Sequence, residues 1–488
     1  MSSNGDPIKQ EPIEEDDALL DAADAAEQIE IAEEEDHHMD SDPEEAIEET
    51  LQFQNDSVAH FDSHTDSIFC IAQHPTDAFI VATGGGDDTT YIWSPTPISR
   101  PLPASYETAP SVERDSLEPL ARLTGHTDSI NAITFTLPNG SSLLTGGLDG
   151  QVRVHDTRNQ TYPLLASVQE VPEINFLAAC PNSEYPDTFA LGASDGSVWV
   201  YTINAAEKEN ALQVLQAYYL HTESCTAGAW TPDGNLLATV SEDGSFYVWD
   251  PFGAAAARGV QGSGQAIVGL TAEDQRFAVE GGLYSIAVAP NGAFAAVGGA
   301  GGNIRIIGLP RLGLPTDQGV RGGGARNKAS GGKKAGGPSA EAGQAGQILA
   351  GLQTQSDGVE TLAFSQPPLT LLAAGSVDGS IALFDHAHRF AVRRHIKDTH
   401  EEFAVIKVEF MPSESGNSNV LTSCGNDGVV RRWDTRGGTA AGGQGLVGEW
   451  RGHRGDGEKG GVLGFVQGGE KGRIVTAGDD GVALVFDG

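Results

Sequence analysis

A pattern of alternating apolar and polar residues recurs along the chain from residue 64 to the C-terminus. Each unit has an apolar run, a few small residues, an Asp-Gly or similar pair, and a second alternating run that often ends in Trp or Asp. Period-two alternation predicts β-strands, and Asp-Gly favours the positive φ angles of a two-residue hairpin. The eight instances are TGGGDDTTYIW (83–93), TGGLDGQVRVHD (145–156), LGASDGSVWVY (191–201), TVSEDGSFYVWD (239–250), VGGAGGNIRIIG (297–308), AAGSVDGSIALFD (373–385), SCGNDGVVRRWD (423–434) and TAGDDGVALVFD (476–487). The pattern therefore predicts an all-β domain of eight repeated units.

A histidine stands ahead of several units, and an alternating strand such as SIFCIAQHP follows it. These histidines are His64, His126, His221, His400 and His453. Together with the Asp-containing turns, they resemble the WD40 repeat, in which each unit is a four-stranded blade of a β-propeller. The resemblance implies an eight-bladed propeller over residues 57–488.

In WD40 blades, a His, a Ser or Thr, the turn Asp and a Trp form a buried hydrogen-bonded set. The resemblance assigns this set to His64, Thr83, Asp87 and Trp93 in blade one and to His221, Thr239, Asp243 and Trp249 in blade four. Buried polar groups must find partners, so we interpret these residues as structural rather than catalytic.

Two inserts interrupt the repeat, a Pro-rich one at residues 95–118 and a Gly-rich one at residues 308–346. Both follow the third strand of a unit, so we expect them on the bottom face of the propeller. The remaining length gives about 46 residues per unit, which suits eight blades. The last unit ends after its third strand, and SVAHF (57–61) reads as a strand without a blade. We therefore expect the N-terminal strand to complete blade eight and close the ring, which leaves no open sheet edge there.

Charge narrows the range of partners. Residues 1–56 hold 21 acidic residues and one basic residue, which predicts a disordered acidic tail. The whole chain carries a net charge of −39, and residues 57–488 are acidic in their own right. Such a surface disfavours nucleic acid and anionic membranes and favours basic partners.

Cysteine usage and the absence of targeting signals point to a compartment. The four cysteines, Cys70, Cys180, Cys225 and Cys424, lie far apart without a CxxC pair, as expected of buried thiols in a reducing environment. The chain has no signal-peptide pattern and no apolar run long enough for a membrane span. We expect a cytoplasmic protein, with the nucleus as a second location.

Motifs that would support catalysis are missing from the sequence. It has no GxxxxGK[ST], GxSxG or HExxH pattern, so we expect no enzyme activity and no cofactor. The HHMD run at 37–40 lies in the acidic tail and is interpreted as solvated charge rather than a metal site. A propeller hydrolase with catalytic residues scattered over loops stays the alternative from another functional class.

Acidic residues gather in the loops that open on one face of a propeller, called the top. These loops precede the first strand of each blade and join its second and third strands. Converging carboxylates focus a negative potential, which predicts an Arg- and Lys-rich peptide as the ligand. As a single residue, each acid is equally well explained as a solvated charge or a turn cap. The expected binding carboxylates are Asp66, Asp128, Glu173, Glu223, Glu242, Asp357, Glu360, Glu401, Glu402 and Asp479, with aromatic contacts from Phe69, Phe176, Tyr284 and Phe403.

A closer resemblance rests on the order of four segments: HFDSHTDSIFCIAQHP, TGGGDDTTYIW, FALGASDGSVWVY and RIVTAGDDGVALVFDG. With the acidic N-terminus, they are similar to the fungal WD40 chaperones dedicated to the large-subunit ribosomal protein L10 (uL16), and to the related angio-associated migratory cell protein family. The resemblance implies a monomer that holds the basic N-terminal segment of newly made L10 on its acidic top face and supports 60S subunit assembly. By motif match, Glu360 and Asp479 fall at acidic top positions. An acidic platform for histone tails or another basic partner is the alternative.

Overall fold

The structure is a computed structural model that describes residues 54–488, except 97–115, 208–209, 261, 263, 313–343, 413–418, 437–444, 455–459 and 470–471. The acidic N-terminal segment, the HHMD run and most of both inserts lie outside the described residues. The described residues all belong to one compact unit, Phe53–Gly488.

The strands form eight antiparallel sheets of four strands each, and each sheet is one blade of a propeller. Blades one and two consist of β2 (Ile68–Gln73), β3 (Val81–Gly85), β4 (Thr90–Trp93) and β5 (Pro119–Leu123), and of β6 (Ile130–Phe135), β7 (Ser142–Gly147), β8 (Gln151–Asp156) and β9 (Leu164–Gln169). Blades three and four consist of β10 (Ile174–Ala179), β11 (Thr188–Ala193), β12 (Val198–Ile203) and β13 (Leu212–Tyr218), and of β14 (Cys225–Trp230), β15 (Leu237–Ser241), β16 (Phe246–Trp249) and β17 (Val268–Leu270).

Blades five and six consist of β18 (Leu283–Val288), β19 (Phe294–Gly299), β20 (Asn303–Gly308) and β21 (Ile348–Gln353), and of β22 (Val359–Phe364), β23 (Leu371–Ser376), β24 (Ile381–Asp385) and β25 (Ala391–Ile396). Blades seven and eight consist of β26 (Val405–Phe410), β27 (Val420–Gly425), β28 (Val430–Asp434) and β29 (Leu446–Trp450), and of β30 (Val462–Gly468), β31 (Arg473–Gly478), β32 (Ala483–Phe486) and β1 (Ala59–Phe61). Short helical turns are α1 (Ala254–Ala257), η1 (Ala300–Gly302) and η2 (His386–His388). Both inserts interrupt a blade after its third strand, between β4 and β5 and between β20 and β21.

The hairpin between the second and third strands depends on residues with positive φ. Gly150 in blade two has φ 70°, and Gly244 in blade four has φ 73°. In blade one the sequence has Asp-Asp instead of Asp-Gly, and Asp88 itself adopts φ 55°. Asp tolerates this left-handed conformation better than most residues, so the turn is kept without glycine.

The N-terminal strand closes the ring, as the sequence predicts. Strand β1 pairs antiparallel with β32, with Ala59 opposite Val485 and Phe61 opposite Ala483. The side chain of Phe61 is fully buried, and its ring stacks on Trp93 of blade one with centroids 4.8 Å apart. The first strand of the propeller therefore belongs to blade eight and packs against blade one.

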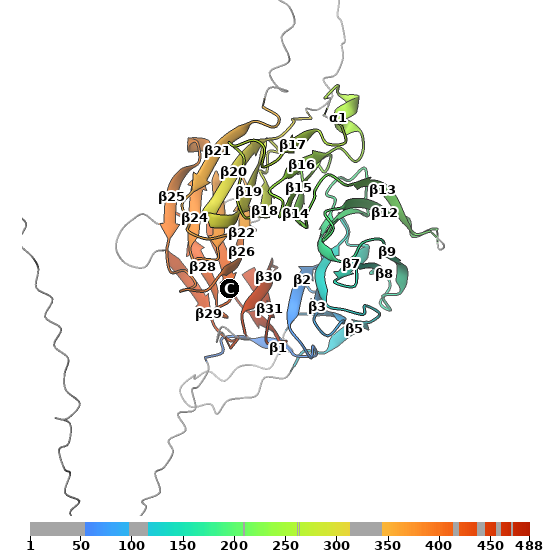
Figure 1. Ribbon diagram of the computed structural model, residues 1–488. Helices are drawn as coiled ribbons and strands as arrows, with labels where there is room; N and C mark the ends of the chain where they lie inside the picture. The colour runs from blue at the N-terminus through green and yellow to red at the C-terminus, as the bar shows by residue number, and fades with distance from the viewer. Residues whose placement is uncertain are drawn as a thin grey trace, which may run out of the picture. The chain divides into compact units, whose positions relative to one another are not determined.

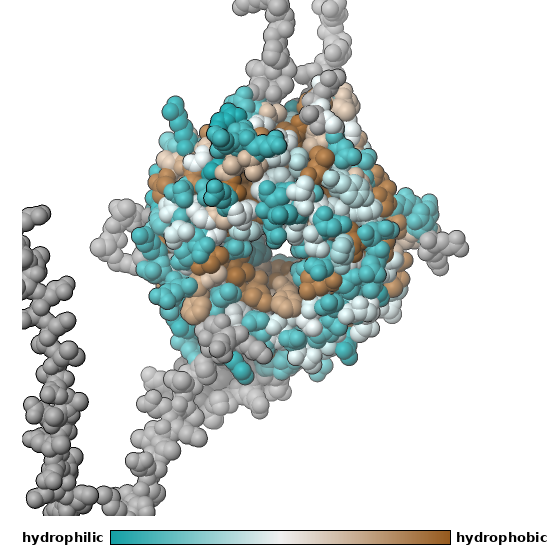
Figure 2. Space-filling model, in the orientation of Figure 1, coloured by the Kyte–Doolittle hydropathy of each residue, from teal (hydrophilic) through white to brown (hydrophobic). Residues whose placement is uncertain are grey.

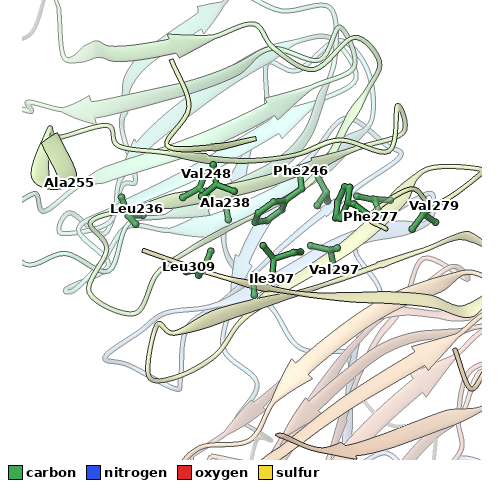
Figure 3. Close-up of a cluster of buried hydrophobic side chains, with 14 residues drawn as sticks. Leu236, Ala238, Phe246, Val248, Ala255, Phe277, Val279, Val297, Ile307 and Leu309 are labelled. Atoms are coloured by element: carbon green, nitrogen blue, oxygen red, sulfur yellow. The ribbon is translucent and has the colours of Figure 1, made fainter. Parts of the chain in front are cut away.

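The hydrophobic core is divided into eight clusters, one between each pair of neighbouring blades. The cluster between blades four and five illustrates the pattern: Phe246 and Val248 of β16 face Val297 and Ile307 of blade five (Figure 3). Each blade thus buries both of its faces, which explains why nearly every residue of the second strands is apolar or small.

The innermost strands line the centre of the ring, and the fourth strands lie at its outer edge (Figure 1). Neighbouring innermost strands contact one another all the way round, including β30 against β2. The space-filling view shows an opening at the centre with apolar residues beside it (Figure 2).

The four cysteines are free thiols, and burial raises the pKa of Cys180 to about 11.

Candidate functional site

The top loops of blade one are held by a buried polar network. His64 Nδ1 lies 3.0 Å from Asp87 Oδ1, and its Nε2 lies 3.0 Å from Thr83 Oγ1. Trp93 Nε1 donates to the same hydroxyl at 3.3 Å. Burial alone would raise the pKa of Asp87, but the hydrogen bond and charge of His64, together with the backbone N–H groups of Thr65 and Thr89, lower it. All four side chains are engaged in fixing the loop that precedes β2.

Blade four departs from the expected set at one position. His221 Nε2 lies 2.8 Å from Thr239 Oγ1, and Trp249 Nε1 also donates to that hydroxyl at 2.8 Å. However, His221 Nδ1 bonds Ser245 Oγ at 2.6 Å instead of Asp243. The carboxylate of Asp243 accepts from the backbone N–H groups of Thr222 and Ser245, each at 2.7 Å. Asp243 thus caps the top loop directly, so the expected His-Asp pair is wrong for this blade.

A first acidic cluster lies on the top loops of blade one and of its two neighbours, blades eight and two, and consists of Asp66, Asp88, Asp128 and Asp479. The hydroxyl of Ser67 donates to Asp479 Oδ1 at 2.6 Å and so joins blade eight to blade one. A Cβ on Gly86 would lie 3.1 Å from the Asp66 carboxyl carbon and 3.2 Å from the Phe69 ring, so both side chains adjoin this glycine. Phe69 is 40% exposed beside these carboxylates.

Asp88 is a member of this cluster that the sequence reasoning missed. Partial burial raises its pKa, and the negative charges of Asp128, Asp87 and Asp149 raise it further. Asp88 occupies the hairpin position where the other units have glycine. This difference between the units is visible in the sequence and could have identified Asp88 as a further acidic residue of the top face. The cluster therefore carries one more carboxylate than expected.

A second acidic cluster belongs to blades four to six and consists of Glu242, Asp357 and Glu360. Packing around the carboxyl group of Glu360 raises its pKa, and the charge of Asp357 adds to the effect. Tyr284 lies among them: burial raises the pKa of its phenol, and the charges of Glu360, Glu242 and Asp357 act in the same direction. The Tyr284 hydroxyl donates to the carbonyl of Gly281, which fixes the ring beside the carboxylates.

Blade seven contributes Glu401 and Glu402, which are both exposed, and the half-buried Phe403. Below them, His400 Nδ1 lies 2.8 Å from Asp427 Oδ1, and Arg431 Nε donates to Glu449 Oε2 at 2.9 Å. Arg431 is thus already paired with carboxylates, while the charge of Glu401 contributes to raising the pKa of the nearby Arg451.

Other expected residues stand apart from the two clusters. Glu173 and Glu223 are exposed in the top loops of blades three and four. Phe176 differs more: its ring packs against Gly192 and Gly228, between these two blades. We therefore assign Phe176 to the packing of the blades, because its ring is committed to that interface.

Cations near the top face are few among the described residues. Arg276 forms an ion pair with Asp274 at 2.7 Å, and Arg454 is exposed just before the undescribed segment 455–459.

Within the described part of the chain, no group of three or more His, Cys, Asp or Glu residues could hold a metal ion. Across the same residues, no helix has the length and apolar character to span a bilayer.

The arrangement favours binding of a cationic chain. The two clusters present seven carboxylates beside two aromatic rings, Phe69 and Tyr284, on loops held rigidly by the blade networks. Each exposed ion pair contributes about 0.2 to 1 kcal/mol, so several must act together with cation–π contacts to the rings.

Comparisons with known proteins agree with this fold. The model of the WD domain, G-beta repeat, matches residues 55–94, 117–156 and 212–250. The ribosome assembly protein SQT1 of Saccharomyces cerevisiae is 28% identical over 94% of this chain and 92% of its own length. The human angio-associated migratory cell protein is 23% identical over 91% of this chain and 83% of its own length.

A solved structure gives a stronger match. Chaetomium thermophilum Sqt1, bound to the N-terminus of the ribosomal protein L10, is 50% identical to this chain, with a TM-score of 0.75. The match covers 89% of this chain and all of that one. At this identity and coverage, the likeness extends from the propeller fold to the individual protein family. The chain therefore belongs to the family of the ribosome assembly protein Sqt1.

Proposed function

We propose that this protein is a chaperone that binds the basic N-terminal segment of newly made ribosomal protein L10 and supports assembly of the 60S subunit. The observation that carries the proposal is the solved Sqt1 relative with the L10 N-terminus bound, half of whose residues are identical to those of this chain. The acidic clusters on the top face provide the physical reason. They offer negative charge and aromatic rings where a chain rich in Arg and Lys would dock.

The binding residues belong to both acidic clusters. Glu360 and Asp479 are the centres of the proposal, with Glu242, Asp357, Asp66, Asp88 and Asp128 beside them. Glu401, Glu402, Glu173 and Glu223 extend the negative field around the ring. The pKa of Glu360 is raised in the free protein. A cation bound beside it favours the ionised carboxylate and so lowers this pKa. In acidic solution, where Glu360 is partly protonated, binding of the cation should therefore release a proton.

The protein acts by binding rather than by turnover. In the described blades, buried His and Asp pairs such as His64 with Asp87 and His453 with Asp480 are engaged in structural networks. We expect a monomer that works in the cytoplasm and also reaches the nucleus. The cargo would stay soluble on the top face until it is loaded onto the pre-60S particle.

A double charge reversal tests the binding site. Glu360→Lys with Asp479→Lys should weaken binding of a synthetic L10 N-terminal peptide at least a hundredfold, measured by fluorescence anisotropy, because two carboxylates are replaced by repelling cations. The matched control is Glu118→Lys with Glu184→Lys, which changes the net charge equally at exposed residues away from the top loops. The control should keep the wild-type thermal transition, while the Glu360→Lys, Asp479→Lys variant should show a somewhat lower but still cooperative transition, because it loses the Ser67–Asp479 hydrogen bond.

Two outcomes would contradict the proposal. Equal peptide affinity in the Glu360 and Asp479 variant would place the site elsewhere. A histone, and no large-subunit ribosomal protein, co-purifying with the wild-type chain and released by salt would favour the histone-tail alternative.

A further inference from the structure

The outer edge of blade six has a charge opposite to that of the rest of the protein. The segment 386–398, HAHRFAVRRHIKD, holds four Arg or Lys residues, three histidines and a single Asp, in a chain of net charge −39. It comprises η2, the strand β25 and the residues just after it. β25 lies at the periphery of the ring (Figure 1).

Three of these cations are exposed and spaced four residues apart. Arg389 precedes β25, Arg393 lies within it, and Lys397 follows it, and all three are exposed. Arg393 has a weak ion pair with Asp385, at 4.0 Å, while Arg389 and Lys397 have no ion pair or side-chain hydrogen bond with any described residue. Arg393 and Lys397 lie about 13 Å apart along the extended strand. Arg389 lies in the left-handed turn just before β25, so the cations extend from this turn to the far end of the strand.

The neighbouring acids do not neutralise this edge. Asp385 is buried, and its carboxylate already accepts from Thr370 Oγ1, the backbone N–H of Ala387 and His388 Nδ1. Asp398 is the one exposed acid of the segment. The innermost strand β22 is three strands away, about 14 Å at the usual strand spacing, which exceeds the screening length of about 8 Å in physiological salt. The negative field of the top face therefore reaches this edge only weakly.

The backbone of β25 is also open on one side. β25 is the outermost strand of its sheet and pairs only with β24, from Ile381 opposite Ile396 to Asp385 opposite Ala391. Within the described part of the chain, its outward N–H and C=O groups therefore have no strand partner. An edge of this kind accepts an extended peptide as an additional strand.

Protection against aggregation is a simpler explanation for charge on an edge strand. The other fourth strands argue against it. Within the strand bounds, β25 has Arg393 and Arg394 and β5 has Arg122, while β9, β13, β17, β21, β29 and β1 have no Arg or Lys. Several even expose apolar side chains, such as Val214 and Val447. A general need for protection would have placed cations on all of them.

We propose that the outer edge of blade six, formed by β25 with Arg389, Arg393 and Lys397, binds an extended acidic peptide segment of a partner protein as a fifth strand. The open row of backbone donors and acceptors favours a polypeptide over a nucleic acid, because phosphates can accept hydrogen bonds from N–H groups but cannot donate to the C=O groups. The evenly spaced cations select carboxylates on that peptide. This site is separate from the top face, so it holds whether or not the proposed cargo is correct.

The test uses the full chain and a fluorescein-labelled peptide of six Thr-Glu repeats, with fluorescence anisotropy as the readout. The triple variant Arg389→Glu, Arg393→Glu, Lys397→Glu should bind this peptide at least tenfold more weakly than wild type. The matched control Arg158→Glu, Arg311→Glu, Arg436→Glu makes the same charge change at exposed arginines outside blade six and should stay within twofold. A peptide methylated on alternate backbone nitrogens should also bind at least tenfold more weakly, because it cannot complete the strand pairing.

Four results would overturn the proposal. These are no measurable binding of the Thr-Glu peptide to the wild type, an equal loss in the control variant, and undiminished binding of the N-methylated peptide. The fourth is tighter binding of a twelve-residue uridine RNA that is lost in the same triple variant, which would assign the edge to phosphate. Circular dichroism should show a cooperative thermal transition for both triple variants, with only a small loss in the control from its exposed ion pairs Arg158–Asp156 and Arg436–Asp434.

Discussion

Phe61 offers a direct test of how the ring is closed. Its side chain is fully buried in the cluster between blades eight and one, stacked on Trp93 and edge-on to Tyr91 with centroids 5.5 Å apart. Replacing a buried Phe by Ala costs about 3 to 5 kcal/mol, and a ring pair of this kind accounts for about 0.5 to 1.5 kcal/mol of such a loss. We therefore expect Phe61→Ala to lower the free energy of unfolding by about 4 kcal/mol, a large part of the 5 to 15 kcal/mol typical of a domain.

Urea denaturation followed by tryptophan fluorescence measures this effect, because Trp93 lies against the substituted ring. The control is Val447→Ala at a side chain that is 58% exposed on an outer strand, where a change below about 0.5 kcal/mol is expected. Deleting residues 57–61 should be at least as damaging as Phe61→Ala, while deleting residues 1–50 should leave the transition unchanged. A loss below about 1 kcal/mol in Phe61→Ala would show that β1 is not needed to hold blades eight and one together.

Two further predictions concern stability. Burial lowers the pKa of His155 to about 4, so the folded state resists a protonation that the unfolded state accepts below about pH 6.5. The free energy of unfolding should therefore fall between pH 7 and pH 5. His155→Leu should reduce that fall by about 2 kcal/mol, measured by urea titrations at each pH. An unchanged pH dependence in His155→Leu would show that this histidine is not kept neutral by burial. Gly150→Ala should cost at least twice as much as Gly253→Ala by thermal denaturation: both glycines have positive φ, but only at Gly150 would a methyl group overlap a backbone oxygen, that of Val171. Equal costs would contradict this steric explanation.

The repeat and its closure could be predicted because both depend on local sequence. Each hairpin between the second and third strands is encoded by adjacent residues, and a final unit with three strands requires a fourth from elsewhere. The segment 57–61 was the available strand, and it does pair with β32. Eight interface clusters are then the consequence of eight blades.

The details of the polar networks were less predictable, since they depend on short side chains that compete for the same partner. Asp243 and Ser245 are two residues apart, and the structure gives His221 to the serine. In blade six, Gln355 occupies the position that histidine has in blades one and four, and its amide donates to the Ser380 carbonyl at 2.9 Å. Either pairing satisfies the buried groups, so the motif alone does not decide between them.

The acidic residues of the top face were predicted individually from the sequence, but their division into two clusters was not. Neighbouring loops from blades eight, one and two carry Asp479, Asp88 and Asp128, although more than 350 residues separate Asp479 from the other two. The sequence position of Phe176 suggested the top face, yet its ring lies between two blades, where the adjoining glycines leave room for it. The cationic edge of blade six was not predicted, because the net charge of −39 favoured an interpretation based on acidic residues alone.

The pairing of β1 with β32 also bears on how the protein is made. Ribosomes release residue 59 long before residue 485, so the earliest strand must wait for the latest one to emerge. Until then, Ser67 and Asp479 cannot meet, and the carboxylates of blades eight and one stay dispersed. An incompletely translated chain would thus lack one of its two anionic sites, and only a finished product could load cargo there.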